Sequence, residues 1–200
     1  MKRASLLGLF LSVCLALRVG AHAEGVQETA VDPSAVAPGD PNRGGSFCIS
    51  PALFMPASTL GTAFYPGGIW NLDFDIGVNP SKSVIFGVGY SDLGSRSNPE
   101  AHLVMVPAWF GFKSKNQFVP SVETFWSMAG ELYYEKSYVS GHTGTGSLEN
   151  LDGGVVAGAG FDLWLTKWLL AGVDSRAHFA IEGAQVFPFV ELGLRIGLRG

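Results

Sequence analysis

The sequence predicts an all-β fold: an eight-stranded, antiparallel, up-and-down transmembrane β-barrel. Three observations favour it. Eight stretches alternate apolar and polar residues with a period of two, which is the period of a β-strand. Only 15% of the 200 residues are charged while 47% are hydrophobic, a lower charge density than ordinary soluble domains have. The connections between the stretches alternate between long and short, as they do in barrels whose two ends face different compartments.

The chain begins with a segment that predicts export. Lys2 and Arg3 precede an apolar run over residues 6–17, and Ala21-His22-Ala23 follows as a small-residue cleavage site. This order is typical of a secretory signal peptide over residues 1–23. Residues 24–45 are rich in Pro, Gly and Asp without periodicity, which predicts a flexible leader. The barrel domain is then expected over residues 46–200.

Each of the eight expected strands is long enough to cross a bilayer when tilted, which takes about 9 to 11 residues. The alternation is clear in the second strand, where Leu72 and Phe74 lie opposite Asp73 and Asp75. The expected strands are residues 46–56, 68–79, 82–92, 101–113, 118–134, 153–166, 168–182 and 185–199.

The last three stretches, from residue 153 onward, alternate most strictly and predict an antiparallel meander. Phe161, Trp164 and Trp168 also fall at helical spacing. The glycines in the same stretch disfavour a helix, and the alternation that follows favours strands. Glycine on the polar face is expected to leave room for large interior side chains.

The long connections are expected over residues 56–67, 93–100 and 135–152, and the short ones at 80–81, 114–117 and 167. The connection at 183–184 is short where a long one is due. Bacterial outer-membrane barrels place their short turns in the periplasm and their longer loops outside the cell.

From these residues the chain resembles the small eight-stranded outer-membrane β-barrels of the OmpA, OmpX and OmpW type. The segment VVAGAGFDLWLTKW, residues 155–168, is similar to a glycine-rich strand, periplasmic turn and return strand of such barrels. The last strand resembles the signal that the barrel-assembly machinery reads, although the chain has an aliphatic residue where an aromatic is usual and ends in Arg199-Gly200 rather than Phe. The residues that fill the places of that signal are Glu191, Gly193, Ile196 and Leu198.

The charged residues on the polar faces are expected to point into the barrel. An eight-stranded barrel is just wide enough for side chains to fill it, and buried charges must be paired. His178 shares a face with Asp174, Arg176 and Glu182, but no usable catalytic triad appears, so a structural network is favoured over an enzyme site. The expected interior network is Asp73, Asp75, Glu123, Glu131, Asp162, Asp174, Arg176, His178, Glu182, Glu191 and Arg195.

The resulting hypothesis is an integral protein of the bacterial outer membrane, with a filled interior and a structural or surface-interaction role. Its partners would be outer-membrane lipid, the assembly machinery during biogenesis, and an external ligand that the sequence does not identify, bound chiefly by residues 135–152. A narrow porin-like channel and a secreted lipocalin-like carrier remain alternatives. The net charge of −4 argues against nucleic-acid binding. His102 and His142 lack partners at metal spacing, so no metal or cofactor is expected.

Overall fold

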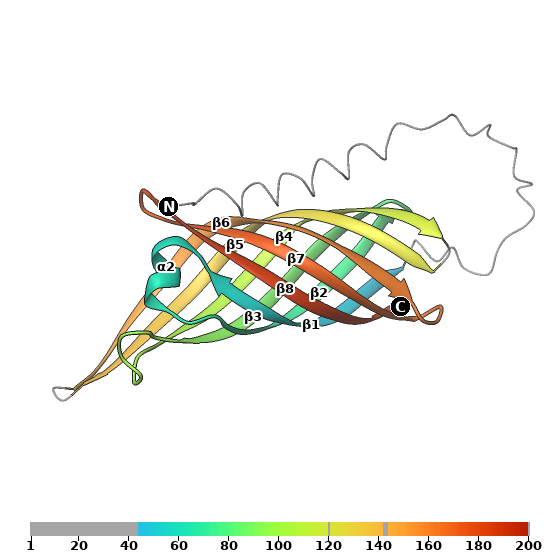
Figure 1. Cartoon of the computed structure of the whole chain (residues 1–200). Helices are drawn as coiled ribbons and strands as arrows, with labels where there is room; N and C mark the ends of the chain where they lie inside the picture. Colours follow the sequence, from blue (N-terminus) through green and yellow to red (C-terminus); the bar gives the residue numbers. More distant parts are fainter. Residues whose placement is uncertain (1–43, 120, 142–143, 200) are drawn as a thin grey trace, which may run out of the picture. The chain divides into compact units, whose positions relative to one another are not determined.

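The computed structural model describes residues 44–119, 121–141 and 144–199, and these form a closed barrel of eight antiparallel strands (Figure 1). Each strand pairs with the next in sequence, and β1 closes the barrel by pairing with β8. The predicted fold class is confirmed. The expected signal peptide and most of the leader lie outside the described residues. The strands are β1 Gly45–Pro56, β2 Gly67–Asn79, β3 Lys82–Gly94, β4 His102–Val119, β5 Val122–Gly141, β6 Gly144–Trp164, β7 Leu169–Glu182 and β8 Gln185–Arg199.

The barrel has polar side chains inside at nearly all the positions where the alternation predicts them, and an apolar exterior. On β8, Leu194 is 61% exposed and its neighbour Arg195 is 4% exposed. Large apolar side chains cover the outer face of every strand. A soluble carrier needs the opposite arrangement, with an apolar lumen and a wet exterior. The lipocalin-like alternative is therefore wrong for this barrel.

The barrel has two ends that differ in their connections. At the turn end, where β1 begins and β8 finishes, the strands are joined by short connections such as the one between Asn79 and Lys82. At the opposite end, called the loop end, lie the short helix α2, Ser58–Ala63, the last residues of β5 and the first residues of β6 (Figure 1). No helix of the described residues is long and apolar enough to cross a membrane.

The expected loop over residues 135–152 is wrong for the described part of that range, because β5 continues to Gly141 and β6 begins at Gly144, and the two strands pair. Lys136 pairs with Glu149 and Tyr138 with Ser147 in one unbroken register. The physical reason is that backbone pairing and the 2.6 Å ion pair between Lys136 Nζ and Glu149 Oε1 stabilise the strands beyond the barrel wall. The hairpin projects past the other strands at the loop end (Figure 1).

The expected short connection at residues 114–117 is also wrong. β4 runs through it to Val119, and β5 begins at Val122 rather than at residue 118. Lys113 and Lys115 point into the barrel on either side of Ser114. The polar side chains that suggested a turn therefore include residues on the inner face of a strand.

Two inward glycines make room for large interior side chains, as the sequence suggested. A Cβ at Gly87 would lie 2.5 Å from the Trp109 ring, and one at Gly160 would lie 2.6 Å from the Phe125 ring. Real Cβ atoms do not approach so closely, so these two aromatic rings fill the interior only because glycine faces them.

The first two loops are fastened together across the loop end. Arg96 donates from Nε to the carbonyl oxygens of Gly61 and Phe64, at 3.0 and 2.9 Å. Its guanidinium also lies over the ring of Tyr65, 4.5 Å from the centroid. The loop that carries α2 is thus held down beside the barrel mouth, where Leu60 and Phe64 pack against interior apolar residues.

Candidate functional sites: the barrel interior and the β5–β6 hairpin

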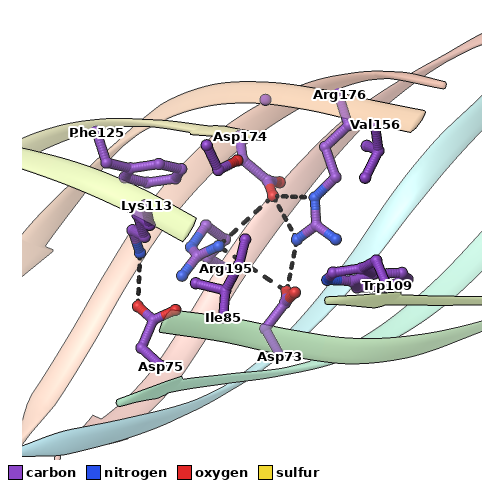
Figure 2. Close-up of a pocket in the computed structure, with 12 residues that line it drawn as sticks. Asp73, Asp75, Ile85, Trp109, Lys113, Phe125, Val156, Asp174, Arg176 and Arg195 are labelled. Carbon is purple, nitrogen blue, oxygen red and sulfur yellow. Dashed lines mark hydrogen bonds and ion pairs between the residues drawn. The ribbon is translucent and has the colours of Figure 1, made fainter. Parts of the chain in front are cut away.

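The half of the interior nearer the turn end is filled by a group of paired charges, called the charge layer, and Figure 2 shows part of it. Arg176 is at its centre, with Nη2 2.5 Å from Asp73 Oδ2 and 2.8 Å from Asp174 Oδ2. These residues come from β2 and β7, which are far apart in the sequence. The layer consists of Asp73, Asp75, Lys113, Lys115, Glu123, Asp162, Asp174, Arg176 and Arg195.

Three further cations belong to the charge layer, and two of them share an aromatic partner. Arg195 donates from Nε to Asp162 Oδ1 at 3.1 Å, and Lys113 Nζ lies 2.7 Å from Asp75 Oδ2. Both cations also lie against the ring of Phe125, at 4.8 and 4.0 Å from its centroid. The cations are thus each in contact with carboxylates and with an aromatic face, the arrangement that a buried charge needs.

A histidine connects the charge layer to the rest of the interior. His178 Nδ1 lies 2.9 Å from Glu131 Oε2, and its Nε2 lies 3.3 Å from Glu191 Oε1. The hydroxyl of Tyr133 donates to the same Glu131 carboxylate, and Asn71 Nδ2 donates to Glu191 Oε2 at 3.1 Å. All five side chains are buried, so no substrate reaches the histidine in this conformation.

The half of the interior nearer the loop end is apolar, and is called the apolar layer. Phe54 and Phe189 have ring centroids 5.0 Å apart, and Tyr133 meets Phe189 edge-on at 5.5 Å. The buried members of the apolar layer are Phe54, Ile69, Leu93, Leu103, Met105, Tyr133, Ala180 and Phe189.

The space left inside the barrel is small. A cavity of about 20 Å³ lies beside Asp73, Asp174 and Arg176 in the charge layer, lined also by Trp109 (Figure 2). A volume of about 10 to 15 Å³ on this measure holds one water, so the cavity accommodates a single ordered water among polar partners. The interior is filled by its own side chains.

Of the eleven residues expected in the interior network, all but one are buried inside the barrel. The exception is Glu182, which is exposed at the loop end, because β7 ends there. Sequence reasoning missed Lys113, Lys115, Asn71 and Tyr133 as members. Lys113 and Lys115 share one face of the strand, with Phe112 and Ser114 on the other. This spacing of two residues was the signal that would have found the two lysines.

The part of the hairpin beyond the barrel has a long free edge on β6. β6 pairs with β7 only from Gly153 onward, opposite Ile181. From Gly144 to Asp152 it pairs with β5 alone among the described residues. Leu148 and Leu151 on this segment are 76% and 70% exposed. A row of unpaired backbone groups with exposed apolar side chains is a template for another strand.

Three carboxylates lie where this free edge begins: Glu135 on β5, Asp152 on β6 and Glu182 on β7, called the acidic trio here. Asn150 Nδ2 donates to Glu182 Oε1 at 3.3 Å, which brings the end of β7 against β6. Lys136 and Glu149 point to the outer face of the barrel at the same height as the trio. Because both are charged, this height lies outside the hydrocarbon layer of the membrane. At that level, burial and the charges of Asp152 and Glu182 raise the pKa of Glu135 to about 7.

No group of three or more His, Cys, Asp or Glu side chains within the described ranges is placed to hold a metal ion. His102 instead lies 3.6 Å from Asp92 on the outer face of the barrel. His142 falls outside the described residues. The part of the chain that the structure covers therefore gives no support for a metal centre.

Comparisons with known proteins place the fold. No protein-family model matches the sequence, and no curated protein matches it. Among solved structures, Neisserial surface protein A (NspA) aligns with a TM-score of 0.63 at 13% identity, over 78% of this chain and 97% of that one. The chain has the fold of the small eight-stranded outer-membrane β-barrels.

A second similar structure is Ail, the attachment invasion locus protein of Yersinia pestis. It aligns with a TM-score of 0.51 at 11% identity, over 78% of this chain and 97% of Ail. Ail in complex with the heparin analogue sucrose octasulfate gives the same TM-score at 12% identity. At these identities the likeness concerns the fold, and the described residues decide the rest.

Proposed function

We propose that the protein is an integral β-barrel of the bacterial outer membrane whose β5–β6 hairpin binds an extended segment of a partner outside the cell. The apolar exterior supports a lipid environment, because exposed leucines such as Leu192 and Leu194 need hydrocarbon around them. The signal peptide predicted at residues 1–23 supports export. In this orientation the turn end lies in the periplasm and the loop end outside.

The observation that carries the proposal is the free edge of β6 from Gly144 to Asp152. Native proteins usually cover or shorten exposed edge strands, since these pair with other chains. Recognition by strand addition uses such an edge: backbone hydrogen bonds supply affinity, and alternate side chains supply specificity. The long hairpin holds this edge away from the membrane surface, where a partner reaches it.

The interior supports a structural role rather than catalysis or transport. His178 is the residue best placed for acid–base chemistry, but both its ring nitrogens face buried carboxylates. The charge layer and the apolar layer fill successive parts of the barrel interior. The cavity within the charge layer holds about one water. We therefore expect purified protein in planar bilayers to give no stable openings. Reproducible openings of porin size would favour the narrow channel.

The terminal strand is proposed as the assembly signal. On β8, Glu191 and Gly193 face inward and Ile196 and Leu198 face outward, and the strand closes the barrel against β1. An alternating last strand that must pair with the first is the segment that an assembly machine has to present. Lipid and this machinery are thus the partners proposed for biogenesis.

The Ail comparison suggests attachment as the kind of role that such a surface serves. The same comparison also marks a difference, because the ligand in the Ail complex is a sulfated, anionic sugar. The acidic trio at the base of the hairpin disfavours an anionic ligand for this chain. An extended peptide is therefore the better occupant for the free edge.

Location is tested by fractionation. The protein should be recovered with outer membranes and should migrate differently on gels with and without boiling, because a closed barrel resists detergent. Recovery as a soluble periplasmic monomer would contradict the proposal.

The docking edge is tested by amide hydrogen exchange on the purified barrel, with extended ten-residue peptides as probes. Binding should protect amides of residues 144–152 and leave β1 to β4 unchanged. A variant in which residues 136–149 are replaced by a two-residue turn removes most of this edge and should lose this protection. Shortening the connection between β3 and β4 serves as the matched control and should leave it intact.

A further inference from the structure

We infer that the strand that docks on the β6 edge is basic, and that Glu135, Asp152 and Glu182 select it. The inference rests on the proposed function, because it requires the free edge to be the docking site. It adds the chemistry of the partner, which the edge alone does not define.

The position of the trio follows from the way β7 ends. β7 accompanies β6 as far as Ile181, opposite Gly153, and Glu182 is its last residue. A strand added to the edge beyond Gly153 therefore continues the line of β7. Because the Glu182 carboxylate already reaches Asn150 on β6, the first side chains of the added strand lie beside the trio.

The trio has no cation of its own. Within the described residues, none of its three carboxylates forms an ion pair with Lys, Arg or His. Lys136 is paired with Glu149 on the opposite face of the hairpin, and Arg96 is hydrogen-bonded to the α2 loop. Asp152 Oδ2 is shielded from solvent and accepts no hydrogen bond. The one printed donor to the trio is the neutral amide of Asn150, so the site has negative charge without a cation, which a Lys or Arg from a partner would supply.

The charge of the site depends on pH near neutrality. Glu135 faces Asp152 from β6 and Glu182 from β7, with the neutral Tyr133 on its own strand and Met105 opposite it on β4. Its pKa of about 7 means that the third negative charge appears as the pH rises through 7. A bound cation stabilises the ionised form, so a basic strand binds more tightly at pH 8 than at pH 6.

The experiment uses three peptides of ten residues, capped at both ends, in which Thr alternates with Lys, Gln or Glu. The barrel is reconstituted in phosphatidylcholine nanodiscs, so that the lipid carries no net charge. At pH 8 and low salt, the Lys peptide should bind about tenfold more tightly than the Gln peptide, the size expected for a few exposed ion pairs. The Glu peptide should bind most weakly. The preference should shrink in high salt.

Matched variants assign the effect to the trio. Replacing all three by Glu135→Gln, Asp152→Asn and Glu182→Gln should remove the preference for Lys and leave protection of the β6 edge by the Gln peptide. Glu135→Gln alone should abolish the difference between pH 6 and pH 8. Glu149→Gln, which removes an acid from the opposite face of the same hairpin, should change neither result.

The outcomes separate the two proposals. If no peptide protects residues 144–152, the docking edge itself is wrong. If the edge is protected but the Lys and Gln peptides bind equally, only the basic partner is wrong. Retention of the Lys preference in the triple variant also overturns it. Where the triple variant fails to show the heat-dependent gel shift of a folded barrel, the single Glu135→Gln variant decides by its pH dependence.

Discussion

The two halves of the barrel interior are built on the same strands but are filled in different ways. Near the turn end, cations such as Arg176 and Arg195 share carboxylates within a closed network. Near the loop end, Phe54, Phe189 and their neighbours pack without charges. A buried ion pair loses the free energy of hydration, and its mutual attraction offsets that loss only when the geometry is good. Apolar packing gains stability from burial alone. The charge layer therefore depends on complete pairing, and the apolar layer depends on shape.

His178 lies at the boundary between the two halves. Its ring nitrogens face Glu131 and Glu191, while its ring centroid is 5.6 Å from that of Phe189. A change on either side of this residue tests one layer with little disturbance of the other. Substitutions at Arg176 and at Phe189 compare the layers in this way.

The largest effect is expected from Arg176→Leu. The change leaves Asp73 and Asp174 as buried carboxylates without their closest cation, and breaking a buried pair in this way costs about 3 to 5 kcal/mol. Unfolding of the reconstituted barrel by denaturant measures the loss. Acid should restore part of the stability, because a protonated aspartate needs no counter-charge.

Arg176→Lys is the matched control, since it keeps the charge and loses only the forked geometry; it should cost less than Arg176→Leu and show no recovery in acid. Equal stability of Arg176→Leu and the unchanged protein would mean that the charge layer is not a mutually dependent network.

An intermediate effect is expected from Phe189→Ala in the apolar layer. Phe189 is buried against Phe54 and Tyr133, and removing such a ring leaves a cavity at a cost of about 3 kcal/mol. Unlike the loss at Arg176, this loss should be the same at neutral and acidic pH. Phe179→Ala, which truncates an outward ring on β7, should cost less, because lipid fills the space. A pH-dependent loss for Phe189→Ala would show that the two layers are coupled through His178.

The inward positions of the barrel were predictable from the sequence because the strand period fixes which side chains share a face. Asp73, Asp174, Arg176 and Arg195 follow from that period alone. The pairing partners do not, since Arg176 meets Asp73 across the lumen from a strand distant in the sequence. The division into two layers could not be predicted either, because Phe54 and Phe189 lie in the local stretches 53–55 and 188–190, which are apolar on both faces of the strand.

The hairpin was missed for a different reason. Residues 135–152 contain glycines and polar residues, a composition that predicts a loop when each residue is judged separately. The structure shows paired strands there, because the cross-strand partners of Lys136 and Tyr138 become apparent only once the register of the barrel is known. The free edge of β6 and the acidic trio follow from this extension, so neither was visible in the sequence.

The smallest effect is expected at the margin of the charge layer. Lys115 Nζ lies 3.8 Å from both Asp75 Oδ2 and Glu123 Oε1, and its side chain is 14% exposed at the turn end. Ion pairs that water reaches contribute about 0.2 to 1 kcal/mol, so Lys115→Gln should lower the free energy of unfolding by no more than that. Salt should reduce the difference further.

Lys113→Gln, two residues earlier on the same face of β4, is the comparison that gives this small effect meaning. Lys113 is 3% exposed and its Nζ lies 2.7 Å from Asp75 Oδ2 and 3.7 Å from Asp162 Oδ2. The same substitution therefore leaves two buried carboxylates short of a cation. Its cost should approach the value of about 3 to 5 kcal/mol that is typical of one broken buried pair. The ratio of the two losses in unfolding free energy, for Lys115→Gln and Lys113→Gln, measures how strongly exposure to water weakens the ion pairs toward the turn end. Equal losses of unfolding free energy at both positions would mean that water is excluded from the charge network as far as the end of the barrel.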